Sequence, residues 1–235
     1  MSRLGRKLWQ MPPRKPRPQT RSYHWGEKLQ QALIDAALRL VEPMGISALS
    51  TRQVARTVGV SHAAPKHYFA DKMALVAAVA SAGFEQMYAK IAKAVKRAGD
   101  RPPDQIVAAG MAYVEFALEN RGLYRTMYAP ELSEPLEQLP GHFAILAQLK
   151  ARVFSLFVEI VREGQLRREF RPGRPDELAR GVTAMANGLS HEFIDEGLGS
   201  RIDRAAHARQ VLGLILAGLE SRPDKPHAGG KRLHI

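Results

Sequence analysis

The sequence contains no cysteine among its 235 residues. This absence excludes a disulfide framework, a thiolate zinc site and a cysteine nucleophile, and it suits the reducing cytoplasm. Long apolar runs are also lacking, since the longest nearly apolar stretch, residues 73–84, contains Ser81 and Gly83. A membrane-spanning helix needs about 20 apolar residues, so we expect no membrane segment. No apolar run follows the basic N-terminus, so we expect no secretory signal either.

Catalytic and cofactor motifs are missing as well. The sequence has no Gly-x-Ser-x-Gly, phosphate-binding loop, His-Glu-x-x-His or dinucleotide-binding fingerprint. His62 and His67 have no Asp or Cys at a spacing suited to a metal. We therefore expect no enzymatic activity, no metal and no cofactor.

Acidic residues are scarce only at the start of the chain. Residues 1–80 hold 13 Lys/Arg and 4 Asp/Glu, a net charge of +9, whereas residues 81–221 hold 18 of each kind. Since the whole chain carries +12, most of the excess lies in its N-terminal third. This distribution predicts that a polyanion binds there.

The two ends of the chain lack helical periodicity. Pro12, Pro13, Pro16 and Pro18 interrupt any helix near the N-terminus, so residues 1–25 are predicted to be a basic flexible arm. The last 15 residues, 221–235, are predicted to be a disordered tail.

Between these ends, apolar residues recur at three- and four-residue spacing, and no strand-like alternation occurs. Pro43 and Gly45 end the first helix, and the stripe from Val76 to Val95 predicts a long helix over about 71–98. The fold class is therefore all-α, with about nine helices. The later helices are expected at 103–117, 123–128, 141–164, 176–197 and 203–220.

The most informative motif covers residues 50–69. Ser50 and Gln53 fit a capping box at the start of a short helix. Gly59 can supply the left-handed backbone of a tight turn, and Ser61 can cap a second short helix. Two short helices on a compact turn are typical of a helix-turn-helix, which presents its second helix to a DNA major groove.

With these residues in place, the chain resembles the TetR family of transcriptional regulators over nearly its whole length after the arm. The matching elements are Gly45, Ser50, Gly59-Val60-Ser61, Tyr68-Phe69 with Lys72, and the helix from Leu75 onward. The resemblance implies a helix-turn-helix DNA-binding domain over 26–75 and a ligand-sensing and dimerisation domain over 76–220. It further implies a cytoplasmic homodimer that represses transcription from a palindromic double-stranded DNA operator and is released by an unknown small-molecule effector.

The C-terminal half is similar to the subgroup whose sensor domain carries a Trp/His/Gly signature. The matching pieces are residues 22–26, 61–65, 122–128 and 186–190. Two positions depart from the family pattern. Lys66 replaces a tyrosine of the recognition helix, and it can meet a phosphate as a cation. Asn187 stands where the subgroup favours histidine, which weakens any ligand role carried over to that position.

Candidate DNA contacts follow from the motif. Residues that flank the two short helices are expected to contact phosphates. Residues of the second short helix, such as His62, Ala63 and His67, are expected to contact base edges in the major groove. A solvated charged face is the alternative interpretation. The candidates are Thr51, Arg52, Ser61, His62, Ala63, Lys66, His67, Tyr68 and Lys72.

Candidate effector contacts lie on apolar helical stripes of the sensor half. Most of these residues can be explained as members of an ordinary hydrophobic core. An all-helical bundle can nevertheless hold an apolar cavity, and methionine lines such cavities readily. The candidates are Phe84, Met87, Met111, Phe116, Met127, Phe157, Met185 and His191. Small residues at 181, 184 and 188, with the broad apolar face of the last helix, suit packing against a second copy.

Two alternatives stay open. The C-terminal bundle of a DNA-binding regulator can serve only to dimerise, without an inducer. The basic arm can also bind RNA, although it has few interleaved aromatic residues, namely Trp9, Tyr23 and Trp25.

Overall fold

The computed structural model describes residues 20–132, 141–195 and 203–220, and within them it confirms the all-α class. These residues form eight α-helices, three short 3₁₀ helices and one isolated antiparallel bridge between Phe170 and Glu220. The α-helices are α1 (Thr20–Met44), α2 (Thr51–Val58), α3 (Lys72–Arg97), α4 (Pro102–Glu119), α5 (Arg121–Met127), α6 (His142–Leu166), α7 (Pro175–Asp195) and α8 (Arg204–Leu219). The 3₁₀ helices are η1 (Gly45–Ala48), η2 (Ala64–His67) and η3 (Pro130–Leu132).

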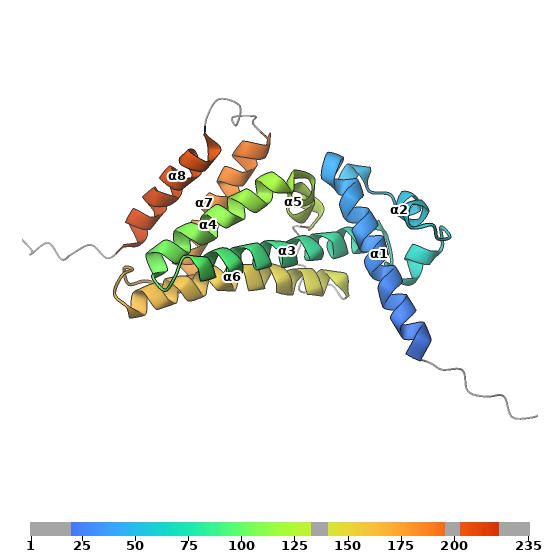
Figure 1. The fold of residues 1–235 in the computed structure, drawn as a ribbon, viewed down its shortest axis with the longest axis horizontal. Helices are drawn as coiled ribbons and strands as arrows, with labels where there is room; N and C mark the ends of the chain where they lie inside the picture. The colour runs from blue at the N-terminus through green and yellow to red at the C-terminus, as the bar shows by residue number, and fades with distance from the viewer. Residues whose placement is uncertain (1–19, 133–140, 196–202, 221–235) are drawn as a thin grey trace, which may run out of the picture.

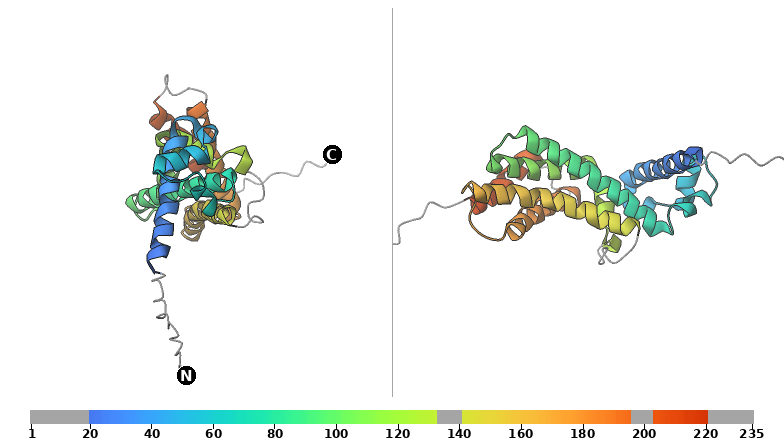
Figure 2. Two further views of the ribbon diagram at one scale, coloured as in Figure 1. Left: turned by 90° about the vertical axis from the view of Figure 1, so that its right-hand side faces the viewer. Right: turned by 90° about the horizontal axis from the view of Figure 1, so that it is seen from below.

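The molecule is elongated, with a small head at one end (Figures 1 and 2). The head consists of α1, α2 and η2, and the bundle is formed by α4 to α8 around the long helix α3. Helices α3 and α6 lie side by side along most of their length. Because α3 starts in the head and ends at the far end of the bundle, it joins the two parts rigidly.

The bounds of α3 follow from local chemistry. The Asp71 carboxylate accepts a hydrogen bond from the Ala74 amide at 2.8 Å, which satisfies one of the free N–H groups of the first turn. Lys96 and Arg97 lie in the last turn, where cations complement the helix dipole. Residues 74–81 are all buried, so this part of α3 is covered on every side by the elements around it.

The predicted arm, residues 1–25, is wrong in residues 20–25. Helix α1 begins at Thr20, so residues 20–25 belong to a helix, and Pro18 is the last proline before it. Proline disrupts a helix because it has no N–H group and its ring clashes with the preceding turn, and no residue from 20 to 25 is proline. Residues 1–19 and the predicted tail, 221–235, lie outside the described residues.

One apolar core runs through both parts of the molecule. It includes Leu33 and Val41 of the head, Phe84 of α3 and Phe157 and Phe193 of the bundle. Continuity of the core means that the head is packed against the bundle and not tethered to it by a linker. The described helices include none that combines the length and the apolar character required to cross a membrane.

Candidate functional sites

The turn of the predicted helix-turn-helix is present. Gly59 has φ of 78° and ends α2, and its N–H and that of Val60 bond back to carbonyl groups of the last turn. The left-handed backbone explains why glycine stands there. The predicted capping box is wrong, because Ser50 occupies the N-cap position but its side chain makes no capping hydrogen bond.

The second element of the motif is a 3₁₀ turn, η2, and not the α-helix that was predicted. Pro65 has no N–H to donate to the Ser61 carbonyl, which accepts instead from the Ala64 amide at 3.0 Å. The Lys66 amide likewise bonds three residues back, to Ala63. The predicted Ser61 cap is also wrong, since Ala63 occupies the N-cap position. The loss of this helix accounts for eight α-helices where about nine were expected.

The predicted DNA-contacting residues lie together on the head. Seven of them are exposed, and Thr51 and Tyr68 are partly buried. Among the described residues, no ion pair involves Arg52, Lys66 or Lys72. These cations are therefore not neutralised within the chain, which suits contact with phosphate groups.

The end of η2 is held by the bundle. At the start of α6, His142 Nε2 donates to the Tyr68 carbonyl oxygen at 3.1 Å, and the His142 ring packs on Phe69 with 5.1 Å between ring centroids. Phe69 is buried and belongs to the apolar core. The position of η2 therefore depends on α6 as well as on α3.

Helix α5 makes a second contact with the head. The Leu123 amide donates to the Glu42 carboxylate near the end of α1 at 3.2 Å. At Gly122 the two backbones approach so closely that a Cβ atom would overlap the carbonyl oxygens of Val41 and Glu42. Only glycine allows this approach, so α5 and the end of α1 cannot move independently.

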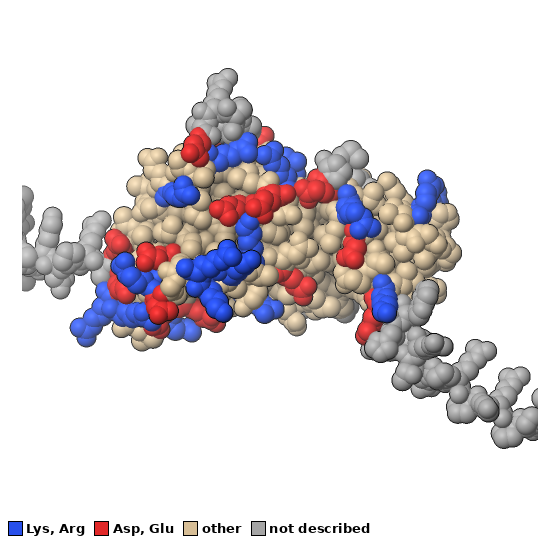
Figure 3. Space-filling view, in the orientation of Figure 1, with Lys and Arg blue, Asp and Glu red and all other residues tan. Residues whose placement is uncertain are grey.

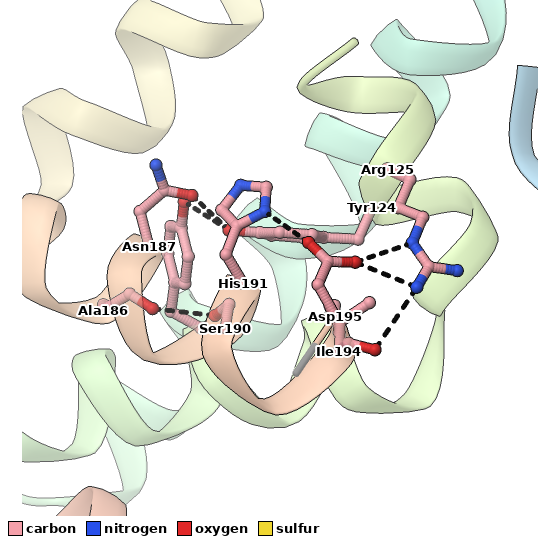
Figure 4. Close-up of polar contacts among 9 residues, drawn as sticks. Tyr124, Arg125, Ala186, Asn187, Ser190, His191, Ile194 and Asp195 are labelled. Carbon is pink, nitrogen blue, oxygen red and sulfur yellow. Dashed lines mark hydrogen bonds and ion pairs between the residues drawn. The ribbon is translucent and has the colours of Figure 1, made fainter. Parts of the chain in front are cut away.

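Three tyrosine hydroxyls meet in the centre of the bundle. Tyr113 of α4 and Tyr128, just after α5, have their hydroxyl oxygens 2.5 Å apart, and the Tyr124 hydroxyl lies 3.5 Å from that of Tyr113. Tyr124 also donates to the side-chain oxygen of Asn187 on α7 (Figure 4). We call these four residues the tyrosine cluster.

The tyrosine cluster is uncharged at neutral pH. Burial raises the pKa of Tyr113 and Tyr124 well above the usual value and the pKa of Tyr128 to about 12. Desolvation disfavours the phenolate in each case, and the neighbouring hydroxyls add to this effect at Tyr113. The three hydroxyls therefore remain protonated and keep their hydrogen-bond donors.

An ion pair lies beside the cluster. Arg125 of α5 donates to the Asp195 carboxylate at the end of α7 at 2.9 Å, and His191 Nδ1 contacts the other carboxylate oxygen at 3.4 Å (Figure 4). Partial burial alone would raise the pKa of Asp195, but the hydrogen bonds from Arg125 and His191 outweigh it and lower the pKa. The His191 ring packs against Tyr124 and Tyr128, so α5 and α7 are joined by both contacts.

The predicted effector contacts do not share one location. Met111 is partly buried, whereas Met185 is 38% exposed on the outer side of α7. His191 is half-buried beside the tyrosine cluster. The remaining five are at most 3% exposed and belong to the packed core: Phe84, Met87, Phe116, Met127 and Phe157.

Helices α7 and α8 leave an open face of small and apolar residues. Gly181 and Gly188 of α7 and Gly213 of α8 have no atom within 4 Å of where a Cβ would stand, and Leu214 is 70% exposed. A groove of 510 Å³ runs between the helices and is lined by Met185, Gly188, Leu189, His191, Glu192, Asp195, His207 and Val211. At these glycines no other described part of the chain covers the face, so another surface can pack closely against it.

The sequence interpretation missed the tyrosine cluster. Tyr124 and Tyr128 stand in the quoted segment 122–128, and Asn187 stands in the quoted segment 186–190. The four-residue spacing of Tyr124 and Tyr128 indicates that the two side chains lie on one side of a helix, so this pair could have been found from the sequence. Their partners lie 11 to 63 residues away, which local spacing does not reveal.

Comparison with known proteins agrees with this architecture. The family model of bacterial regulatory proteins of the tetR family matches residues 33–79, and that of the tetracyclin repressor-like C-terminal domain matches residues 106–215. The regulator BetI of Brucella suis is 27% identical over 183 residues, covering 76% of this chain and 85% of BetI. BetI of Rhizobium meliloti is 45% identical over 49 residues, which are 21% of this chain and 24% of that protein.

Solved structures share the fold along most of the chain. A Rhodococcus sp. RHA1 protein of unknown function has a TM-score of 0.71 and 27% identity, covering 90% of this chain and all of its own. A tetR-family regulatory protein of Rhodococcus RHA1 has a TM-score of 0.64 and 23% identity, with 83% and 99% covered. With both family models matched and α2 and its Gly59 turn in place, the chain belongs to the TetR family and is a DNA-binding transcriptional regulator.

Proposed function

We propose that the protein is a cytoplasmic homodimeric repressor that binds a palindromic operator and is released by a small neutral effector. The observation that carries the proposal is the position of α5, which contacts the head through Gly122 and Leu123 and the tyrosine cluster through Tyr124. A ligand at the cluster would therefore act on the element that supports the DNA-binding head. The protein acts by binding and not by catalysis.

In this proposal the recognition turn η2 enters the major groove. His62 and Ala63 precede it and are exposed, so they contact base edges, while Arg52, Lys66 and Lys72 contact phosphates. Thr51, Ser61, His67 and Tyr68 complete the interface from the predicted set. Two copies related by a two-fold axis present two such turns to successive major grooves, so the operator is a pseudo-palindrome.

The open face of α7 and α8 supports the homodimer. Its exposed glycines allow two helices to approach closely, and exposed Leu214 and Met185 gain from burial. A two-fold interface uses the same face on both subunits. The groove between the helices is then covered by the partner.

The tyrosine cluster supports an effector that accepts hydrogen bonds and carries no charge. The contact between Tyr113 and Tyr128 uses only one of their two hydroxyl hydrogens, so the other can be donated to an effector. The guanidinium of Arg125 is already paired with Asp195. The surrounding side chains, such as Phe84 and Phe157, are apolar and favour aromatic or aliphatic bulk. An effector that replaces the 3.5 Å contact between Tyr124 and Tyr113 would change the position of α5.

The test uses a duplex that the wild-type protein selects from a randomised pool. A library of neutral small molecules is screened for release of this duplex by fluorescence anisotropy. We expect hits whose effect is lost in Tyr124→Phe, while Tyr88→Phe, an α3 tyrosine that keeps its ring under Arg152, responds normally. The effector lowers operator affinity only by the ratio of its affinities for the free and the DNA-bound states. Equal responses of the two variants contradict the assigned site.

A second candidate function is favoured by the tight core. Five of the eight predicted effector contacts are at most 3% exposed and packed together, as in a bundle that serves only to dimerise. In that case the wild-type protein binds its duplex with the same affinity in the presence of every compound. A His62→Ala variant still relaxes base preference at one position per half-site, since DNA reading does not depend on the sensor.

A further inference from the structure

The recognition turn η2 is too short to fix its own orientation. It has four residues, and 3₁₀ hydrogen bonds, such as that from the Lys66 amide to the Ala63 carbonyl oxygen at 3.1 Å, close a single turn. The geometry of such bonds is poorer than in an α-helix, so one 3₁₀ turn gives little rigidity. The direction in which η2 presents its side chains is therefore set by the residues that follow it and by what they contact.

Tyr68 and Phe69 directly follow η2 and are tied to it. Their amides both donate to the Pro65 carbonyl oxygen, at 3.0 Å from Tyr68 and 2.9 Å from Phe69. The Phe69 ring is 2% exposed and belongs to the apolar core, so it cannot shift without disturbing the packing around it. A contact that fixes Tyr68 and Phe69 consequently also fixes η2.

His142 makes such a contact from the sensor domain. It is the first residue of α6, whose first turn lies at the end of the bundle nearest the head (Figure 1). A carbonyl oxygen only accepts, so the 3.1 Å contact between His142 Nε2 and the Tyr68 oxygen requires the proton on Nε2. The same ring packs on Phe69 at an angle of 35°. One side chain therefore supplies both a hydrogen bond and a ring contact to the end of η2.

Base contacts depend on the position of η2 more than phosphate contacts do. Lysine and arginine are long and flexible, so they can follow a phosphate when the backbone shifts. His62 and Ala63 have shorter side chains, and they read base edges only at hydrogen-bond or van der Waals distance. A binding constellation has to be held within about 0.5 Å of its productive geometry. We therefore expect a displaced η2 to lose base reading before it loses phosphate binding.

We propose that His142 is a positioning residue for operator recognition, which holds η2 where His62 and Ala63 reach base edges. The inference rests on the proposed entry of η2 into the major groove, and it adds a sensor-domain residue to the determinants of sequence preference. His142 acts through the Tyr68 carbonyl group and the Phe69 ring and not by contact with DNA. The hydrogen bond from Nε2 is the interaction that sets the position.

Two substitutions separate the hydrogen bond from the ring contact. His142→Phe keeps an aromatic ring against Phe69 but has no donor, whereas His142→Gln keeps an N–H donor and loses the ring. The control is Ile160→Ala, which leaves a cavity at a buried position in the half of α6 remote from the head. None of these changes alters a Lys, Arg, Asp or Glu, so the charged surface drawn in Figure 3 is the same in all variants.

Dissociation constants are measured by fluorescence anisotropy for the duplex that the wild-type protein selects and for an unrelated duplex of equal length. We expect His142→Phe to bind the selected duplex at least about tenfold more weakly, as for a lost base contact. Its affinity for the unrelated duplex stays within about twofold of the wild-type value, because phosphate contacts persist. His142→Gln keeps most of the preference, and an equal loss in this variant contradicts the role of the hydrogen bond. Ile160→Ala keeps the full preference, although urea denaturation shows that it is less stable.

A double variant tests whether His142 acts through η2. In His62→Ala the base contact of residue 62 is already absent. Adding His142→Phe should therefore weaken binding to the selected duplex by a smaller factor than it does in the wild-type background. A purely structural role of His142 gives the same factor in both backgrounds.

Three further results overturn the proposal. An unchanged duplex preference in His142→Phe shows that the hydrogen bond does not position η2. Equal weakening on both duplexes, in His142→Phe and in Ile160→Ala alike, shows a loss of folded protein. Equal factors in the two backgrounds place the effect of His142 outside η2. If the wild-type protein binds all duplexes equally, operator reading itself is rejected, and the role of His142 with it, before any variant is compared.

Discussion

Lys66 is the residue of the recognition turn whose role depends most on its chemistry. Its side chain is exposed and lies where the family favours tyrosine, and we propose that it meets DNA as a cation. We expect Lys66→Ala to weaken binding to all duplexes alike and to reduce the salt slope by roughly 2 for a dimer, since each phosphate contributes ~0.9. Anisotropy titrations at several salt concentrations measure both effects. A change in the preferred bases would instead make Lys66 a base-reading residue.

Gly122 sets the distance between α5 and the head. In Gly122→Ala the new methyl group overlaps the carbonyl oxygens of Val41 and Glu42, so the helices must separate. We expect a loss of about 1–3 kcal/mol in the free energy of unfolding, as for other overpacked sites. Gly26→Ala is the control, because its Cβ would lie 3.8 Å from the nearest atom, the Tyr68 hydroxyl, in ordinary contact.

Urea denaturation of the two glycine variants distinguishes steric overlap from helix propensity. Alanine in a helix is more favourable than glycine by roughly 0.8–1 kcal/mol, so Gly26→Ala should be more stable than the wild-type protein. A gain of stability in Gly122→Ala would show that the added methyl group fits between α5 and α1 without overlap.

At the scale of the elements, α5 and α7 are joined by the Arg125–Asp195 pair. The folded state lowers the pKa of Asp195, so the pair stabilises the fold above the unfolded pKa of about 3.9, and this stabilisation is lost as the pH falls through the lowered value. Both side chains are nearly half exposed, so we expect only ~0.2–1 kcal/mol.

The measurement is the free energy of unfolding of the wild-type protein and of Asp195→Asn at pH 7 and pH 3. The variant should be less stable than the wild-type protein at pH 7, and the difference should be smaller at pH 3, as protonation of the Asp195 carboxyl group begins. A difference that is the same at both pH values would mean that the pair acts through packing and not through charge.

At the scale of the whole molecule, dimerisation is tested on the α7–α8 face. Leu214 is 70% exposed on α8, and we expect Leu214→Arg to place two charges against each other across the two-fold axis and to convert the dimer to a monomer. Leu166, at the end of α6, is 74% exposed, which makes Leu166→Arg a matched control that should remain dimeric. Light scattering at micromolar concentration measures the mass. A wild-type monomer would reject the proposed assembly.

Local sequence determined the elements whose causes are local. The left-handed turn at Gly59, the Asp71 cap and the apolar stripe of α3 depend on residues a few positions apart, so their helix and turn were predicted within a residue or two. The all-α class follows in the same way, since helical periodicity extends along the chain. The family resemblance also rested on short motifs, and both family models confirm it.

Tertiary structure decided what local patterns leave open. Serine at positions 50 and 61 permits a cap but does not require one, and neither side chain forms the predicted cap. Helical spacing identified Met127 and Met185 as members of stripes, yet packing buried one completely and left the other on an open face. A stripe shows which side of a helix is apolar, whereas what covers that side depends on residues far along the chain. The tyrosine cluster exists only because α4, α5 and α7 pack together.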